Sequence, residues 1–462
     1  MFRRRLAVLV ATVFVTVTAT ATPAWAHGGG PTTLPLPLGQ ILYGAFFVLV
    51  ISFLLLRTSW PTARLGHTAI GRPLGVAIAR VVAVLAVLVR TLGLVLFAVT
   101  ISAAWVGDTS SLNNIANVMI YVLLWLGVQI LSVVFGDVWA VLSPFDTIAM
   151  AASWVSRRRR PTRVVKRPPD TSLVWSHWPA ALGVFDFLWL ELCYHSPAEP
   201  RVLARVMTAY SVVVLGISAR YGRRWLRTGE AFAVLFAMLA AMAPVFRDDA
   251  GTLRVRVPFS GLATYVPRRG SMAIVYVLLG GVGFDSLQRT RWWVDVQGDA
   301  IGWDRTWVAT FGLVWSVGIV ATVCVAAALA AGRLRGTSDS DAVSSSFGAL
   351  LPFAFGLLFA HSFALLLNES QSAIALFSNP YGKNWDLFHT ADHVINFQPL
   401  RAQTVVWVQV VAVVASQVVG LALMHDRAVS DAPDARATRA QIPMVGLAVV
   451  LALAGLTVLL KV

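Results

Sequence analysis

The chain has 462 residues, of which 57% are hydrophobic and only 13% charged, and its mean hydropathy is +0.72. This composition excludes an ordinary soluble domain and indicates an integral protein of the lipid bilayer. The net charge of +15 does not indicate a nucleic-acid partner, because a prominent arginine-rich run at residues 157–167 lies between apolar segments, where basic residues fix membrane topology.

The first residues have the pattern of a signal peptide, which we assign to residues 1–26. Residues 3–5 supply the positive region, residues 6–17 the apolar core, and residues 24–26 (AWA) a small-residue cleavage site. Cleavage there makes His27 the first residue of the mature chain. The alternative is that residues 6–20 stay attached as a short anchor.

Beyond the signal, about eleven apolar segments are long enough to form membrane helices or parts of them. They lie near residues 38–56, 75–103, 115–135, 179–196, 202–219, 230–246, 270–287, 306–331, 347–368, 402–424 and 442–460. We therefore expect residues 27–462 to form a single all-α polytopic membrane domain. An alternating stretch at residues 252–262 is typical of a short hairpin strand.

The arginines between these segments predict the orientation of the chain. With the mature N-terminus outside, the early arginine clusters fall inside, as the positive-inside rule requires. If residues 230–246 crossed the membrane, the later arginine-bearing linkers at 247–269, 333–335 and 427–439 would lie outside. If residues 230–246 instead form a re-entrant or interfacial segment, all three linkers lie inside. We therefore predict roughly ten crossings plus one half-helix in the plasma membrane, with both mature termini extracytoplasmic.

A polar outer loop at residues 369–401 contains the first candidate site. If residues 385–395 form one short helix, Asp386, His389 and His393 share a face. Imidazole and carboxylate groups are ligands for Zn, Mn, Fe or Cu, so such a face suits a divalent metal, whose identity the sequence leaves open.

Other candidate ligands lie near the outer ends of apolar segments. Glu191 and His195 are spaced to share a helix face, and His361 lies toward the outer end of its own segment. A mature N-terminal His27 offers both its amine and its ring, an arrangement similar to the copper brace of secreted copper proteins. The alternative is that these histidines make ordinary hydrogen bonds and that His27 belongs to a flexible exposed end.

Ionisable residues within apolar segments need partners, because an unpaired charge in the membrane is costly. We expect Arg90 to face Asp186 or Glu191 across the bundle, in a structural ion pair or an anion-holding cavity. Asp285 is interpreted as a polar group at a helix end. The sequence contains no G-x-S-x-G elbow, Walker A loop or H-E-x-x-H motif.

Several motifs occur together along most of the chain. They are Ala26-His27-Gly28, Leu34-Pro35-Leu36-Pro37-Leu38, Gly136-Asp137-Val138-Trp139 with Ser143-Pro144, Trp189-Leu190-Glu191-Leu192, Gly229-Glu230-Ala231-Phe232, Gly382-Lys383-Asn384-Trp385-Asp386-Leu387-Phe388 and His425-Asp426-Arg427-Ala428. In these motifs the chain resembles the actinobacterial membrane proteins labelled fenitrothion hydrolase. The resemblance implies hydrolysis of organophosphate esters, which usually uses a metal-activated water or a positioned base. The resemblance identifies no established active-site residues. It also predicts a small residue, typically glycine, at the position that His389 occupies in this chain.

The resemblance therefore leads us to expect a hydrolase-like membrane protein that acts, with or without a metal, on a small-molecule ester such as an organophosphate, in a pocket that opens outward. Glu191 and Asp386 are the predicted catalytic carboxylates, which should approach each other or share a partner. The candidate ligands for a divalent metal are His195, His361, His389, His393 and His27. The alternatives are a permease with a midplane site built from Arg90, Asp186 and Glu191, or a non-catalytic metal-handling subunit. The oligomeric state is left open.

Overall fold

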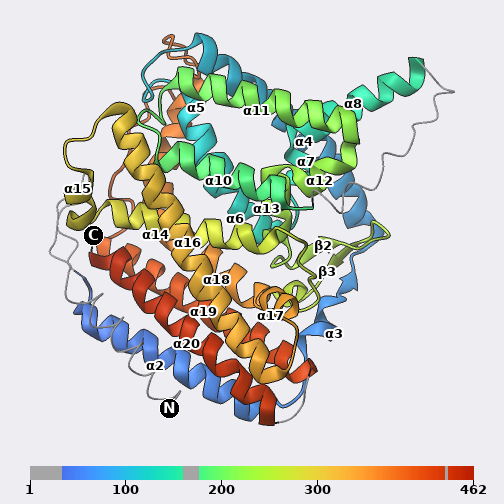
Figure 1. Ribbon diagram of the computed structural model, residues 1–462. Helices are drawn as coiled ribbons and strands as arrows, with labels where there is room; N and C mark the ends of the chain where they lie inside the picture. The colour runs from blue at the N-terminus through green and yellow to red at the C-terminus, as the bar shows by residue number, and fades with distance from the viewer. Residues whose placement is uncertain (1–33, 160–175, 432–434, 462) are drawn as a thin grey trace.

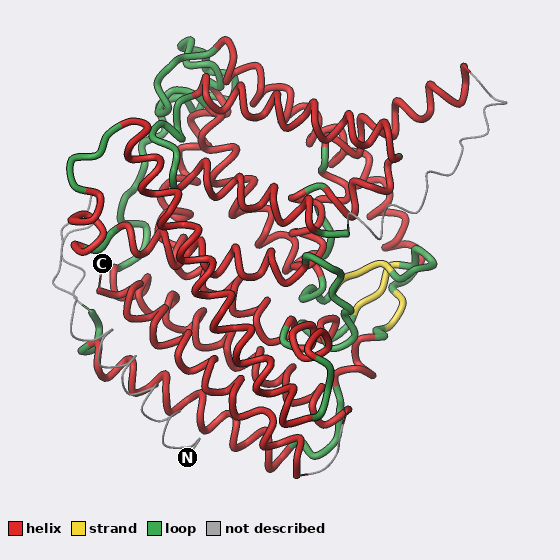
Figure 2. The backbone as a smooth tube through the Cα atoms, in the orientation of Figure 1, coloured by secondary structure: helices red, strands yellow, loops and turns green. Residues whose placement is uncertain are grey.

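The computed structural model describes residues 34–159, 176–431 and 435–461 of the chain. Helices make up most of this part and run side by side as a bundle, with the strands confined to one small region at its edge (Figure 2). The chain is an all-α polytopic membrane protein, as the composition predicts.

Nine helical segments among the described residues are long and apolar enough to cross a membrane (Figure 1). They are α2 (Leu38–Ser59), α4 (Val76–Val106), Ile115–Phe135, α11 (Pro200–Tyr221), α14 (Ser271–Gln288), α16 (Gly302–Arg335), Asp339–Ser378, α19 (Ala402–Asp431) and α20 (Ala435–Lys461). The third comprises α5 (Ile115–Asn117), the π-helix η1 (Val118–Gly127) and α6 (Val128–Phe135), and the seventh comprises α17 (Asp339–Ser345) and α18 (Phe347–Ser378). On α4, Val76 and Val84 are 68% and 64% exposed, as expected of a surface that contacts lipid.

Shorter elements connect these spans. The helices are α3 (Leu65–Ala69), α7 (Trp139–Leu142), α8 (Pro144–Arg159), α10 (Trp178–Leu192), η2 (Arg223–Trp225), α12 (Leu226–Gly229), α13 (Ala231–Ala240), η3 (Ser260–Leu262) and α15 (Arg291–Gln297). The strands are β1 (Arg72–Pro73), β2 (Val245–Arg247) and β3 (Leu253–Val255), which pair antiparallel in the order β1-β3-β2. β3 confirms the strand predicted within residues 252–262.

Helix α10 has only 15 residues, but its two ends lie at opposite ends of the bundle. Just before it, the backbone N–H of His177 donates to the carbonyl oxygen of Arg269, which precedes α14 (2.9 Å). Just after it, Cys193 belongs to the same buried cluster as Trp293, which follows α14. Helix α10 therefore runs parallel to α14 over its whole length. We count it as one more membrane crossing beside the nine longer segments, which agrees with the roughly ten crossings predicted.

Helix α13 does not cross the bundle. Its 10 residues extend over about 15 Å, roughly half the thickness of the hydrocarbon layer. Arg227, which precedes the helix, and Arg247, which follows it, line one cavity together with Arg268. Both ends of α13 therefore lie on the same side of the bundle, as predicted for a half-helix at residues 230–246.

A buried carboxylate fixes the start of α13. Glu230 is the N-cap residue, and its side chain accepts hydrogen bonds from the backbone N–H groups of Phe232 and Ala233 at 3.0 and 2.7 Å. Trp139 Nε1 and Tyr210 Oη donate to the same carboxylate, at 3.1 and 2.5 Å. Since Trp139 and Glu230 belong to the motifs at residues 136–139 and 229–232, these two motifs meet to hold the half-helix in place.

The intramembrane Arg90 has a partner other than those expected. Its Nη1 lies 2.9 Å from Oδ2 of Asp146, and Arg223 contacts both oxygens of the same carboxylate at 2.5 and 2.6 Å. The prediction that Arg90 faces Asp186 or Glu191 is therefore wrong. Asp146 lies in the first turn of α8, which packs against α4 and so brings a carboxylate to the arginine from a segment that is hydrophilic in sequence.

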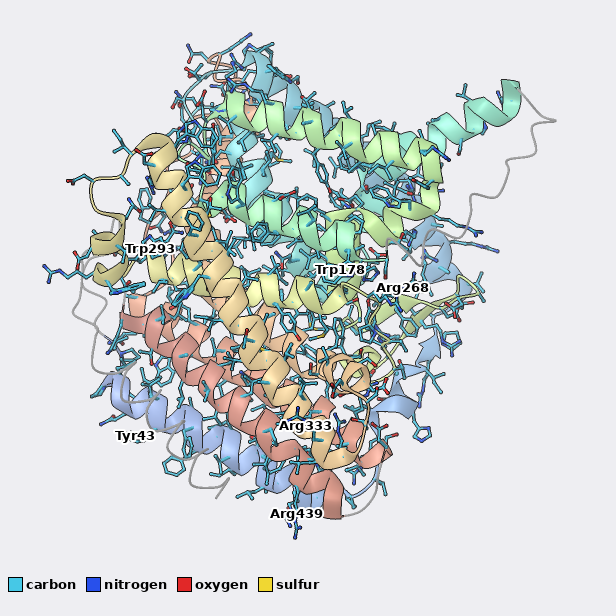
Figure 3. The ribbon with its side chains drawn as sticks, in the orientation of Figure 1. Tyr43, Trp178, Arg268, Trp293, Arg333 and Arg439 are labelled. Atoms are coloured by element: carbon cyan, nitrogen blue, oxygen red, sulfur yellow. The ribbon has the colours of Figure 1, made fainter. Side chains whose placement is uncertain are left out.

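Basic residues gather at one end of the bundle, which we call the arginine end. Arg72 in β1 pairs with Val255 in β3, so the first linker and the linker after α13 meet there. Arg268, Arg333 and Arg439 lie toward this end, away from Tyr43 and Trp293 (Figure 3). Early and late arginine-bearing linkers therefore share one end, which is the arrangement expected when α13 turns back.

Candidate functional site

The loop predicted at residues 369–401 begins only at residue 379, because α18 continues to Ser378. Residues 379–401, all of which the structure describes, consist of turns and extended segments. Asn384 and His389 have φ angles of +58° and +57°, which a right-handed helix does not contain. The side chains of Asn379 and Asp386 each accept a hydrogen bond from a backbone N–H further along the loop, at 2.8 and 3.0 Å. The expected helix over residues 385–395 is therefore wrong, because these local hydrogen bonds favour turns instead.

Asp386 and His389 remain neighbours despite the absence of that helix. His389 Nδ1 lies 3.5 Å from Asp386 Oδ2, with the two side chains 94% and 46% exposed. The backbone N–H of Ala391 holds the pKa of Asp386 below its ordinary value. His393 is also exposed, and its backbone N–H donates to the carbonyl of Thr390. The positive φ of His389 favours glycine, the residue that the family resemblance leads one to expect there.

Glu191 and His195 do not share a helix face, because α10 ends between them. Nδ1 of His195 lies 3.2 Å from Oγ1 of Thr306, and its ring packs against neighbouring aromatic rings. Glu191 lies within the bundle, close enough to Asp285 for their charges to interact, and its Oε2 is buried without a hydrogen-bond partner. Asp386 lies on the exposed loop. In the described residues no hydrogen bond or ion pair joins the predicted pair Glu191 and Asp386.

The predicted ligands do not assemble a metal site in the described part of the chain. Residues 34–159, 176–431 and 435–461 contain no group of three or more His, Cys, Asp or Glu side chains that could hold a metal ion. Among the described residues, His195 and His389 each have a single hydrogen-bond or ion-pair partner through the side chain, and His27 lies outside this part of the chain. The donor set therefore does not fit a metal held by three protein ligands.

Four polar side chains instead meet between α14 and α18. His361 Nε2 lies 2.6 Å from Asp285 Oδ2, and His361 Nδ1 lies 3.1 Å from Ser286 Oγ. Arg289 Nη2 lies 3.2 Å from His361 Nε2 and 3.5 Å from each oxygen of Asp285. His361 therefore bridges a hydroxyl and a carboxylate through its two ring nitrogens. The histidine of a Ser-His-Asp triad does the same with the nitrogens exchanged, because there Nε2 faces the serine and Nδ1 the aspartate.

The sequence of α14 explains how these groups are held together. Asp285 and Arg289 are one helical turn apart, and Ser286 follows Asp285 directly. Gly280 and Gly281 let the helix approach its neighbours closely, since a Cβ on Gly280 would lie 2.5 Å from the backbone of α16 and one on Gly281 would lie 2.6 Å from a leucine of α10. The glycines thus serve helix packing, and they fix the position of the polar end of α14.

Exposure increases from one side of the cluster to the other. Ser286 is 6% exposed and the His361 side chain 7%, whereas the side chains of Asp285 and Arg289 are 28% and 47% exposed. The cluster is therefore accessible from the side of the carboxylate and the guanidinium, with the hydroxyl at its deep end. Glu191 adds a second carboxylate near Asp285.

Sequence reasoning selected His361 but missed its partners. Asp285 was interpreted as a helix-end group, and Ser286 and Arg289 were not selected, because 76 positions separate Asp285 from His361 and no local pattern joins them. A signal was nevertheless present. Both residues lie in apolar segments, where an ionisable side chain needs a partner, so an acid on one span predicts a base on another.

The fold and the cluster together define a multi-pass membrane protein with a hydrogen-bonded serine, histidine and aspartate between two of its spanning helices. Comparison of the chain with known protein families, with curated proteins and with solved structures gave no match.

Proposed function

We propose that the protein is a membrane hydrolase that acts on a small ester, such as an organophosphate, at Asp285, Ser286 and His361. The observation that carries the proposal is the His361 ring, with one nitrogen 3.1 Å from a serine hydroxyl and the other 2.6 Å from a carboxylate. In this arrangement the histidine can act as the base for a serine nucleophile, as in the Ser-His-Asp triads of unrelated folds but with the roles of the two ring nitrogens exchanged. The resemblance to proteins labelled fenitrothion hydrolase supports the same chemistry.

The reaction follows from the hydrogen bonds. With its proton on Nε2, His361 donates to Asp285 and leaves Nδ1 free to accept the proton of Ser286. Ser286 Oγ attacks the phosphorus or carbonyl carbon, Nδ1 takes the hydroxyl proton, and the bond to the leaving oxygen breaks as His361 returns that proton to it. Water then attacks the serine ester and gives a proton to Nδ1. The bond to Oγ breaks and Ser286 recovers its proton, while Asp285 stays ionised and stabilises the imidazolium.

Arg289 suits the charge that develops in this reaction. Its guanidinium carries only donors, lies at the accessible side of the cluster and is 47% exposed. It can therefore stabilise the anionic oxygen of a phosphoryl or carbonyl group in the transition state. Because Ser286 is 6% exposed and the surrounding helices are apolar, the site favours a small, neutral, lipid-soluble ester over a charged one.

Turnover by matched serine variants tests the proposal. Ser286→Ala and His361→Gln should each lower kcat for a 4-nitrophenyl ester or a dimethyl phosphorothioate by about 10³-fold or more. Ser316→Ala is the control, because Ser316 is equally buried (7% exposed) but donates only to the carbonyl of Gly280. Equal rates for Ser286→Ala and Ser316→Ala, with both proteins folded and monodisperse, would contradict the proposed nucleophile.

We further propose that the arginine end faces the cytoplasm of a cell whose plasma membrane holds the protein. The shared end of Arg268, Arg333 and Arg439 supports this orientation through the positive-inside rule. The mature N-terminus, beginning at His27 after signal cleavage, would then be extracytoplasmic. Cysteines substituted at Arg227 and Thr252 should be labelled only from the cytoplasmic face. Labelling of the two positions from opposite faces would contradict this topology.

Glu191 favours a second candidate function, a proton-coupled permease. Its buried Oε2 has no hydrogen-bond partner in the described residues and lies near the carboxylate of Asp285. Protonatable carboxylates inside a membrane domain are typical of proton-coupled carriers. If Glu191→Gln abolishes pH-driven solute uptake into reconstituted vesicles while Ser286→Ala does not, the permease replaces the hydrolase as the better account.

A further inference from the structure

A cavity of about 580 Å³ opens at the arginine end, away from the Ser286 cluster. Its walls come from α13, from the strands that follow this helix, and from the loop that leads into α14. Figure 3 shows Arg268 at this place beside Trp178, on the side of the bundle opposite Trp293. The volume is in the range of cavities that bind small molecules or parts of larger ligands.

The lining of this cavity is positively charged. Its charged residues are Arg227, Arg247, Arg256, Arg268, Asp248 and Asp249, so the arginines outnumber the aspartates by two. His177 also lines the cavity, but burial and the charge of Arg268 lower its pKa to about 4, so its ring is neutral at physiological pH. The ring instead holds the wall in place through a 2.8 Å hydrogen bond between Nδ1 and Ser271 Oγ.

Close contacts hold Arg256 and Asp248 in the wall of the cavity. Arg256 donates to the carbonyl oxygens of Ala240, Ala241 and Ala243 at 3.0–3.2 Å and so caps the C-terminal end of α13. Asp248 forms an ion pair with Arg254 at 3.2 Å. These contacts stabilise the wall of the cavity. Arg227, Arg247 and Arg268 are then the groups that can bind an anion in it.

The remaining arginines have unused donors. The guanidinium of Arg268 makes no hydrogen bond or ion pair with any described residue. Arg227 lies 3.7 Å from Asp137 with its side chain 61% exposed, and Arg247 donates one hydrogen bond to a loop carbonyl. Planar guanidinium groups that converge on one cavity match the oxygens of a phosphate group better than they match a monatomic anion.

Part of the lining of the cavity is apolar. Val234 and Ala237 line it from α13 and Ala241 from the C-cap position of this helix, and their spacing puts them on one face. Phe246 in β2 also lines the cavity. A lining that combines arginines with apolar side chains suits a phosphate group that is attached to an apolar body.

We propose that this cavity binds a phosphate group, carried either by a soluble phosphate ester or by a lipid headgroup at the membrane surface. Arg227 and Arg268 make the principal contacts, and Arg247 adds a third guanidinium to the lining. Since the cavity lies at the other end of the bundle from Ser286, the proposal stands independently of ester hydrolysis.

The test compares arginine variants of the full-length protein with two probes. Inorganic phosphate is titrated against chloride at equal ionic strength, and the protein is separately placed in phosphatidylcholine nanodiscs with and without phosphatidic acid. Arg268→Gln and Arg227→Gln should each weaken binding of the effective probe about tenfold, the effect of losing one charge-assisted hydrogen bond. Arg333→Gln is the control, because Arg333 is an exposed arginine of the same end that does not line the cavity.

The inorganic phosphate and phosphatidic acid experiments distinguish the two sources of the phosphate group. Inorganic phosphate binding that depends on Arg268 supports a soluble phosphate ester as the ligand, whereas dependence confined to phosphatidic acid supports a lipid headgroup. The melting temperature without probe verifies that each variant is folded, and Arg268→Lys, which keeps the charge but loses the planar donors, should give intermediate binding. Failure of both probes to bind, or equal binding by Arg268→Gln and Arg333→Gln, would overturn the proposal.

Discussion

Removal of the Glu230 carboxylate tests how the half-helix is held. Glu230 is 1% exposed and receives four hydrogen bonds, two from backbone N–H groups of α13 and two from the side chains of Trp139 and Tyr210. Glu230→Ala removes the helix cap and leaves two buried side-chain donors without an acceptor. We therefore expect α13 to lose its fixed start.

The magnitude follows from these contacts. Loss of the cap lowers stability by about 1 kcal/mol, and each stranded donor lowers it by roughly 1–3 kcal/mol. Relief of the desolvation of a buried carboxylate offsets part of this loss. We expect the free energy of unfolding to fall by about 3 kcal/mol in total, with Glu230→Gln intermediate because one acceptor oxygen remains.

Denaturation by titration with sodium dodecyl sulfate measures the change in mixed micelles. Glu199→Ala is a matched control, because Glu199 is also an N-cap glutamate in extended backbone, before α11, but its side chain makes no capping hydrogen bond. Glu199→Ala should change stability little. If Glu230→Ala and Glu199→Ala destabilise the protein equally, the proposed role of the Glu230 hydrogen bonds is refuted.

Three further predictions concern other parts of the chain. Asp146→Asn should lower the free energy of unfolding by about 3 kcal/mol, because it leaves Arg90 and Arg223 facing each other without a carboxylate; a loss below about 1 kcal/mol in the same titration would contradict this. His389→Gly should raise the melting temperature and leave ester turnover unchanged, since it removes about 1 kcal/mol of left-handed backbone strain; loss of activity would instead support a role for this ring. Because folding lowers the pKa of His177 from 6.5 to about 4, the unfolded chain binds more protons between these values, so stability is full above pH 6.5 and falls as the pH approaches 4. Thermal melts across this range should show that loss, and His177→Asn, which has no titrating ring, should reduce it.

The spanning helices could be predicted from sequence because hydrophobic length and arginine placement are local properties. The short helix α13 was recognised for a different reason: only a segment that turns back puts Arg268 and Arg333 at the end where the early arginines lie. Partners across the bundle could not be predicted in the same way. Arg90 pairs with Asp146, which belongs to a segment of hydrophilic character that folds against α4.

In the candidate site, too, single residues could be predicted from the sequence but their contacts could not. His361 could be predicted as a site residue from its place toward the predicted outer end of an apolar segment. The helix face expected for Asp386 and His389 does not form, since side chains of the loop bind its backbone and favour turns. Glu191 lies within the bundle, with its Oε2 buried. Its neighbour is Asp285 rather than Asp386, because α10 and α14 run parallel while the loop lies outside the helices.

Covalent labelling would show whether Ser286 is a nucleophile. The purified protein is treated with a small fluorophosphonate, digested, and analysed by mass spectrometry to locate the phosphonyl group. We expect one adduct on Ser286 that is absent from Ser286→Ala, strongly slowed in His361→Gln and unchanged in Ser316→Ala. An unmodified Ser286 in folded protein, or labelling that proceeds equally fast without the His361 ring, would contradict the proposed nucleophile.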